Sequence, residues 1–96
     1  MIFSDFIKLK ASTNLPPGLP PLLKALLLDA SGDWDAAHSI AQDIPSDDGS
    51  WVHAYLHRKE GDHWNANYWY SRAGRRMPEM SLEEEWIEIS KALCEN

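Results

Sequence analysis

Residues 49–78 read GSWVHAYLHRKEGDHWNANYWYSRAGRRMP, and this stretch decides the fold. Small and apolar residues recur in it every three or four positions, which is the spacing of one face of an α-helix. Gly61 and Asp62 interrupt the pattern, because glycine ends a helix and aspartate caps the start of the next one. The stretch therefore predicts two helices, residues 50–60 and 63–74, joined by a tight turn.

A weaker copy of this pattern, GDWDAAHSIAQ, occupies residues 32–42. When the two Gly-Asp pairs are aligned, Ala25 matches Ala54 and Ala37 matches Ala66. Two helices pack closely only where the side chains between them are short. The matched alanines therefore predict two similar antiparallel hairpins over residues 20–78. No segment alternates polar and apolar residues over any length, so we predict an all-α fold.

The remaining segments are predicted to flank the hairpins within a single domain, residues 1–96. Residues 1–19 form an N-terminal segment that ends in a proline-rich strap, because proline fixes φ and lacks the N–H that a helix needs. In residues 79–96, Ser81 and Glu84 have the spacing of a capping box. We therefore expect a C-terminal capping helix there.

Composition and charge exclude several classes of protein. With 44% hydrophobic and 25% charged residues, the chain resembles an ordinary soluble domain. No apolar run approaches the roughly 18 residues of a membrane span, and no secretory signal is recognisable. The net charge of −6 argues against nucleic-acid binding. The single cysteine suits a reducing compartment. We therefore expect a cytoplasmic protein without nucleic-acid or membrane partners.

The charge is also unevenly distributed along the chain. Residues 53–78 have more Arg and Lys than acidic residues, whereas residues 79–96 have more Glu than Lys. Either the last helix folds back on the basic region, or two chains pair in this way; solvated helix faces are the simpler alternative. Because two hairpins bury only a limited core and helical repeats usually need three, we predict a homodimer.

The second hairpin resembles a tetratricopeptide repeat. Ala54 stands at the small position of the first helix, Gly61 at the turn, Ala66 and Tyr70 in the second helix, and Pro78 at the closing proline. The resemblance implies a fold of two tetratricopeptide-like hairpins followed by a capping helix.

The first hairpin matches that repeat only in part. Pro45 comes early, and Ala41 replaces the expected aromatic residue. The phrases at residues 32–42 and 51–75 are also similar to a family of short, uncharacterised bacterial proteins. That likeness implies no activity and bears on the fold alone.

The tetratricopeptide resemblance also indicates a binding surface. In such proteins the corresponding face of the first helix lines a concave groove that holds peptides, which places four residues there: Trp51, Tyr55, Arg58 and Lys59. Aromatic and Arg side chains are frequent interface anchors. The leading hypothesis is therefore a non-enzymatic module that binds a peptide or partner protein on this face. The alternative is that the tryptophans are core: Trp64, Trp69 and Trp86 buried, and Trp51 half-covered by the strap.

Two histidines carry the second hypothesis, a protein that binds a metal or a small ligand. His53 and His57 lie four residues apart on one helical face, where two imidazoles can share a transition metal. His38 and Glu60 are candidates to complete the shell. Ala54 takes the place of the glutamate that follows the first histidine in zinc-protease helices. The alternative is a pair of histidines hydrogen-bonded within the hairpin interface.

A third group, Arg72, Arg75 and Arg76, suits an anion, since Arg forks bind oxyanions in a bidentate manner. The alternative is a charged helix end that complements the helix dipole. The sequence contains no glycine-rich phosphate loop, serine-nucleophile motif or cysteine cluster. We therefore predict no catalytic residues, no cofactor and no enzymatic activity.

Overall fold

The computed structural model describes residues 1–12 and 14–94 of the chain. The regular secondary structure of these residues is entirely helical, which confirms the predicted all-α class: α1 (Phe3–Lys8), the short 3-10 helix η1 (Leu9–Ala11), α2 (Pro21–Ala30), α3 (Trp34–Gln42), α4 (Asp47–Glu60), α5 (His63–Arg72) and α6 (Leu82–Cys94). Position 13 of the predicted strap and positions 95–96 of the predicted last helix lie outside the described residues. Among the described helices, none combines the length and the apolar character needed to cross a lipid bilayer.

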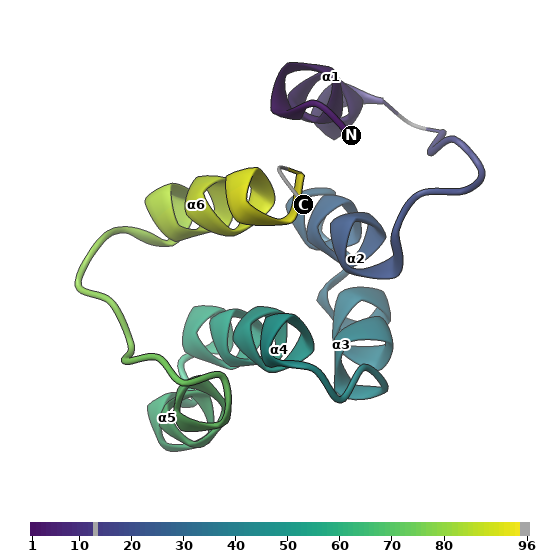
Figure 1. The fold of residues 1–96 in the computed structure, drawn as a ribbon. Helices are drawn as coiled ribbons and strands as arrows, with labels where there is room; N and C mark the ends of the chain where they lie inside the picture. Colours follow the sequence, from purple (N-terminus) through teal and green to yellow (C-terminus); the bar gives the residue numbers. More distant parts are fainter. Residues whose placement is uncertain (13, 95–96) are drawn as a thin grey trace.

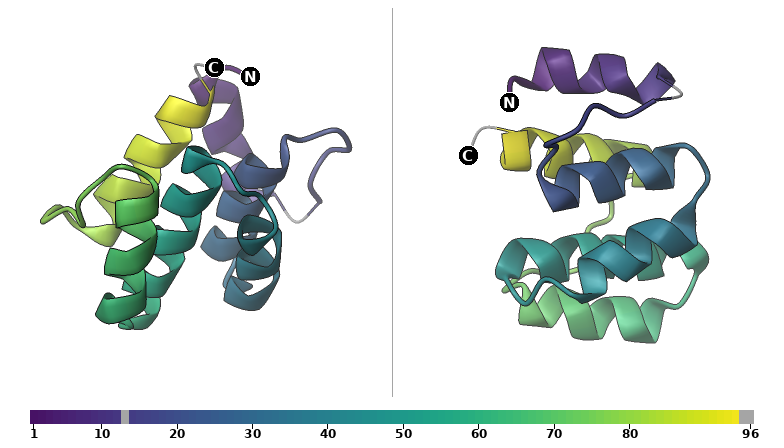
Figure 2. Two further views of the ribbon diagram at one scale, coloured as in Figure 1. Left: turned by 60° about the horizontal axis from the view of Figure 1, so that its bottom comes forward. Right: turned by 90° about the vertical axis from the view of Figure 1, so that its right-hand side faces the viewer.

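The helices form two antiparallel pairs, α2 with α3 and α4 with α5, and the pairs meet where α3 packs against α4 (Figure 1). Helix α6 lies across α2 and α4, and α1 packs on the other side of α6. The right-hand view of Figure 2 shows the resulting layers: α1, then α6 with α2, then α4 with α3, and α5 at the far end. The last helix therefore covers the face that α2 and α4 share.

The two Gly-Asp corners have the same local geometry. Gly32 has φ 94° and Gly61 has φ 89°, values in the left-handed region where a side chain is strained. The carboxylates of Asp33 and Asp62 each accept a hydrogen bond from the backbone N–H three residues further on, at 3.1 and 3.2 Å. The expected bends are therefore present, and they are equivalent.

The observed start of α4 differs from the predicted one. The helix begins at Asp47, three residues before the expected Ser50, because Ser46 caps it by accepting from the Gly49 N–H at 3.0 Å. Gly49 lies inside this first turn, where an added β-carbon would come within 2.1 Å of the carbonyl oxygen of Ile44. Glycine is required here for close packing and does not interrupt the helix.

The alanines and the last helix follow the sequence pattern. The four matched alanines of the hairpins are fully buried: Ala25, Ala37, Ala54 and Ala66. The capping box at the start of α6 also forms, since Ser81 and Glu84 each bond the other's backbone N–H at 3.1 Å. From this start, α6 places Trp86 against Phe6 of α1, with ring centroids 5.7 Å apart.

Candidate functional site

Helix α4 has two polar faces, one packed against α6 and the other against α3. The predicted groove face points at α6. Trp51 and Tyr55 are only 3% and 2% exposed beneath this helix. This corrects the predicted peptide groove, because a segment of the same chain occupies it. The covering element is α6, and not the proline-rich strap.

The centre of this covered face is Glu85 of α6, whose carboxylate is almost completely buried. It accepts hydrogen bonds from the Tyr70 hydroxyl at 2.6 and 2.7 Å, from Arg58 Nη1 at 2.9 Å and from Trp51 Nε1 at 3.3 Å. Arg58 also donates to the carbonyl oxygen of Met80. Two of the four residues predicted to bind a partner thus bind this carboxylate.

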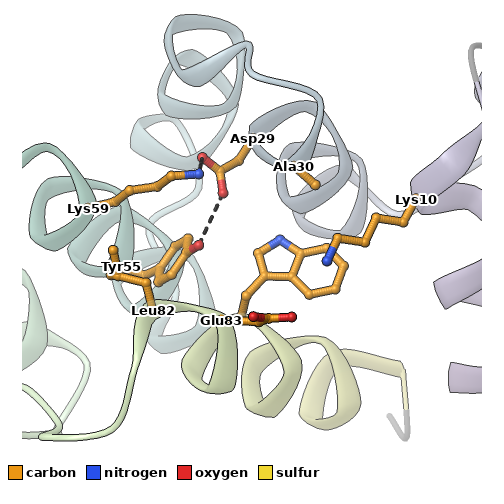
Figure 3. A pocket seen from close by; sticks show the side chains of 8 residues that line it. Lys10, Asp29, Ala30, Tyr55, Lys59, Leu82 and Glu83 are labelled. Atoms are coloured by element: carbon orange, nitrogen blue, oxygen red, sulfur yellow. Dashed lines mark hydrogen bonds and ion pairs between the residues drawn. The ribbon is translucent and has the colours of Figure 1, made fainter.

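The other two predicted partner residues surround a second buried carboxylate, Asp29 of α2 (Figure 3). Asp29 accepts from the Tyr55 hydroxyl at 3.2 Å and pairs with Lys59 Nζ at 3.0 Å. A small hollow opens beside it, bordered by Lys10, whose ammonium lies 4.6 Å from the ring centroid of Trp86. Burial, reinforced by the bonded carboxylates, raises the pKa of Tyr55 and Tyr70, so both hydroxyls stay protonated.

The tryptophans divide between the core and the surface. Trp86 is buried as predicted, and Trp69 is half-buried. Trp64 is 79% exposed, so the alternative that placed it in the core is wrong for this residue. It lies on the side of α5 opposite Ala66 and Tyr70, the residues that pack against α4.

The other polar face of α4 carries His53 and His57, and it points at α3. Both imidazoles are buried, with 5% and 7% exposure. His38 of α3 joins them, and its Nε2 lies 3.0 Å from Nε2 of His53. One ring nitrogen from each of the three residues lies within 4.8 Å of the other two. The structure therefore brings together the three predicted metal ligands, from two different hairpins.

Two tryptophans stack on two rings of this histidine cluster, those of His38 and His53. Trp34 stacks on His38, with ring centroids 4.8 Å apart and planes 14° apart, and its Nε1 donates to the Leu56 carbonyl at 2.8 Å. Trp69 stacks on His53 at 4.1 Å. The sequence pattern did not reveal these roles, although Trp34 lies four residues before His38 and so shares its helical face.

Glu60 orients the third ring. Its carboxylate lies 2.7 Å from Nδ1 of His57. Since an ionised carboxylate only accepts hydrogen bonds, Nδ1 of His57 donates to it, and in the neutral ring this tautomer leaves the lone pair on Nε2. A carboxylate that fixes the tautomer in this way is typical of metal-binding histidines. Glu60 therefore acts behind the cluster and need not be a ligand itself.

Burial disfavours the charged form of two of the three histidines, His38 and His53. Burial, followed by the neighbouring His38 and His57, lowers the pKa of His53 to about 4. Burial and His57 likewise lower the pKa of His38 below its ordinary value. At neutral pH these two rings are therefore uncharged, which is the form that binds metal ions.

The three arginines of the predicted anion site have different surroundings. Arg75 lies over the ring of Trp51, with Cζ 3.4 Å from its centroid. Arg72 lies 5.6 Å from the ring centroid of Trp69 and donates to the Tyr68 hydroxyl at 3.2 Å. Arg76 is exposed. Two of the three guanidinium groups thus cover aromatic rings, and anion binding by this group remains a prediction.

No protein-family model matches this chain, and no match was found among curated proteins or solved structures. The geometry of the described residues is therefore the only guide to a function.

Proposed function

We propose that this protein binds a divalent transition-metal ion through His38, His53 and His57. The observation that supports this function best is the meeting of three imidazole nitrogens within 4.8 Å, from two hairpins. Imidazole suits zinc, copper and nickel. In a tetrahedral site with Zn–N bonds of about 2.0 Å, ligand nitrogens stand about 3.3 Å apart, so small side-chain shifts suffice. Three histidines leave a fourth position for water or another ligand.

Hydrogen bonding alone explains less of this geometry. One bond joins His38 to His53, and another joins His57 to Glu60. Within the described part of the chain, no hydrogen bond joins His57 to the other two rings. A metal ion at the centre of the cluster accounts for all three rings and for the role of Glu60.

Titration of untagged protein with zinc or nickel, followed by calorimetry, tests the proposal. We expect one ion per chain and at least a tenfold loss of affinity in His38→Ala and in His53→Ala. The matched control is His63→Ala, because His63 is the fourth histidine and is exposed outside the cluster. Equal binding by the wild type and by a variant that lacks all three cluster histidines would contradict the proposal.

Tryptophan fluorescence gives an independent measurement, because Trp34 and Trp69 stack on two of the ligands. Bound copper or nickel quenches an indole in van der Waals contact with its ligands, so saturation should remove much of the emission. Glu60→Gln should weaken binding by about tenfold while leaving quenching at saturation intact, as expected for a residue behind the ligands.

A second candidate function is non-enzymatic association with another protein, the leading hypothesis from the sequence. A different surface now supports it: Trp64 and Tyr68 of α5 are 79% and 48% exposed. Large exposed aromatic side chains in a group are frequent at interfaces. The predicted homodimer would use this surface. Chemical cross-linking of wild type and Trp64→Ala is the test, and an unchanged set of cross-linked products would contradict it.

A further inference from the structure

Helix α5 stands at one end of the molecule (Figures 1 and 2). Among the described helices its backbone packs closely against α4 alone, and the Tyr70 hydroxyl reaches Glu85 of α6. Trp64, Tyr68 and Arg72 follow one another at intervals of four residues, so they lie along one side of α5. This side is opposite the buried residues Ala66 and Tyr70. We call these three residues the α5 face.

The α5 face is unusual for the end of a helical stack. Terminal helices of such stacks normally carry a polar outer surface, because no further helix covers them. Here two aromatic rings are largely exposed. Helix α6, which comes next in the chain, lies against α2 and α4 and leaves the face uncovered.

Opposite charges lie at the two ends of helix α5. Glu60 and Asp62 are exposed at the turn before α5. Arg72 and Arg76 are exposed at its other end. A partner of one charge sign would be attracted at one end and repelled at the other. A second copy of this helix, running in the opposite direction, matches both ends.

Resting on the second candidate function, we propose that two copies of this chain pair through their α5 faces, antiparallel, about a twofold axis beside Tyr68. Residues equally far before and after Tyr68 then come opposite one another. Trp64 faces Arg72 of the partner subunit, a cation–π pair, and the acidic turn at residues 60–62 faces Arg76 of the partner subunit. Twofold symmetry makes each contact occur twice.

The size of the face sets the strength of the pairing. A helix of ten residues is about 15 Å long, so each copy contributes less than the roughly 800 Å² of a standard interface. We therefore expect a reversible dimer whose fraction rises with protein concentration.

Sedimentation equilibrium of the full chain with a chelator present tests the pairing independently of metal binding. The mass should rise from one chain to two as concentration increases. Trp64→Ala and Arg72→Glu should each weaken association at least tenfold without changing helicity in circular dichroism. The matched control is Lys24→Glu, a charge reversal at an exposed position of α2. A monomer at all concentrations, or a dimer that both α5 variants leave unchanged, overturns the proposal.

The geometry has its own test. A Tyr68→Cys thiol would lie next to its symmetry mate, so mild oxidation should give a disulfide-linked dimer, whereas Lys24→Cys should not. A dimer that Tyr68→Cys cannot cross-link overturns the antiparallel arrangement. If instead the chain stays monomeric while Trp64→Ala abolishes a complex with a different protein, the second candidate function stands and the pairing fails. Metal titration is unaffected by any of these outcomes.

Discussion

Two faces of one helix, α4, carry polar groups into the interior, and they are paired in different ways. On the side of α6, the groups are complementary: Trp51 and Arg58 of α4 donate to the carboxylate of Glu85, and Tyr70 of α5 joins them. On the side of α3, the groups are alike: His53 and His57 meet His38.

The difference separates a structural network from a binding site. Buried polar groups need partners, and a network that supplies them internally has no need of a ligand. Three converging imidazoles offer lone pairs to a metal ion, and no imidazole of the cluster can take the place of that ion. From the sequence, the first face was the leading candidate for binding and the histidine pair was the alternative; α6 covers the first face, and the proposed metal site uses the second.

The largest effect is expected at the complementary face. Glu85→Gln removes a buried charge and leaves Arg58 without its ion pair, which should lower the free energy of unfolding by about 3 kcal/mol. Urea unfolding measures it. Glu88→Gln, on the exposed side of α6, is the matched control and should change little. A loss at Glu85 no greater than at Glu88 would show that the network is not structural.

Metal addition should separate the two faces. If free zinc is at about 100 times Kd, the folded state gains about 2.7 kcal/mol. The thermal midpoint should rise by a similar amount in the wild type and in Glu85→Gln, and it should rise clearly less in His53→Ala. A Glu85→Gln protein that no longer responds to zinc would show that the two faces act as one unit.

The pH dependence should also distinguish the faces in metal-free protein. His53 has a pKa lowered to about 4, so between pH 6.5 and 4 the unfolded state binds the extra proton and stability falls as pH falls. Tyr55 and Tyr70 have raised pKa values, so their contribution is complete below pH 10 and is lost above it. Unfolding of wild type and His53→Gln across this range is the measurement. The variant should lose part of the acid dependence and keep the alkaline one.

The smallest effect is expected at the start of α6. Ser81→Ala removes the side chain that accepts from the Glu84 N–H, at a cost of about 1 kcal/mol. Ser39→Ala, exposed within α3, is the control. Because Ser81 positions Glu85 but is remote from the histidines, zinc affinity should not change. A change in zinc affinity would link α6 to the histidine cluster.

Local signals made the fold predictable. Glycine at positive φ and an aspartate cap define each corner within a few residues, and matched alanines indicate where helices come close. The histidine cluster was predictable for a similar reason. The spacing of His53 and His57 fixes their face, and the match between the hairpins puts His38 near that face.

The position of α6 was harder to predict. Glu83, Glu84 and Glu85 are identical in type, and only the packing of Trp86 and Ile89 determines which of them is buried. The uneven charge predicted, as one alternative, that the last helix folds back on the basic region, and Arg58 does pair with Glu85. The tetratricopeptide resemblance implies an open groove, however, so it gave no reason to place α6 there. The exposure of Trp64 could, by contrast, have been predicted from the sequence, because two residues of helix place it on the side opposite Ala66.

The place of α6 also affects how the chain matures on the ribosome. Domains fold as they emerge, starting from the N-terminal side. The ribosome synthesises Trp51, Tyr55 and the donors to Glu85 before residues 82–94. These side chains therefore stay exposed until α6 leaves the exit tunnel. The nascent chain therefore exposes an aromatic surface late in synthesis, and a chaperone could bind it during this interval.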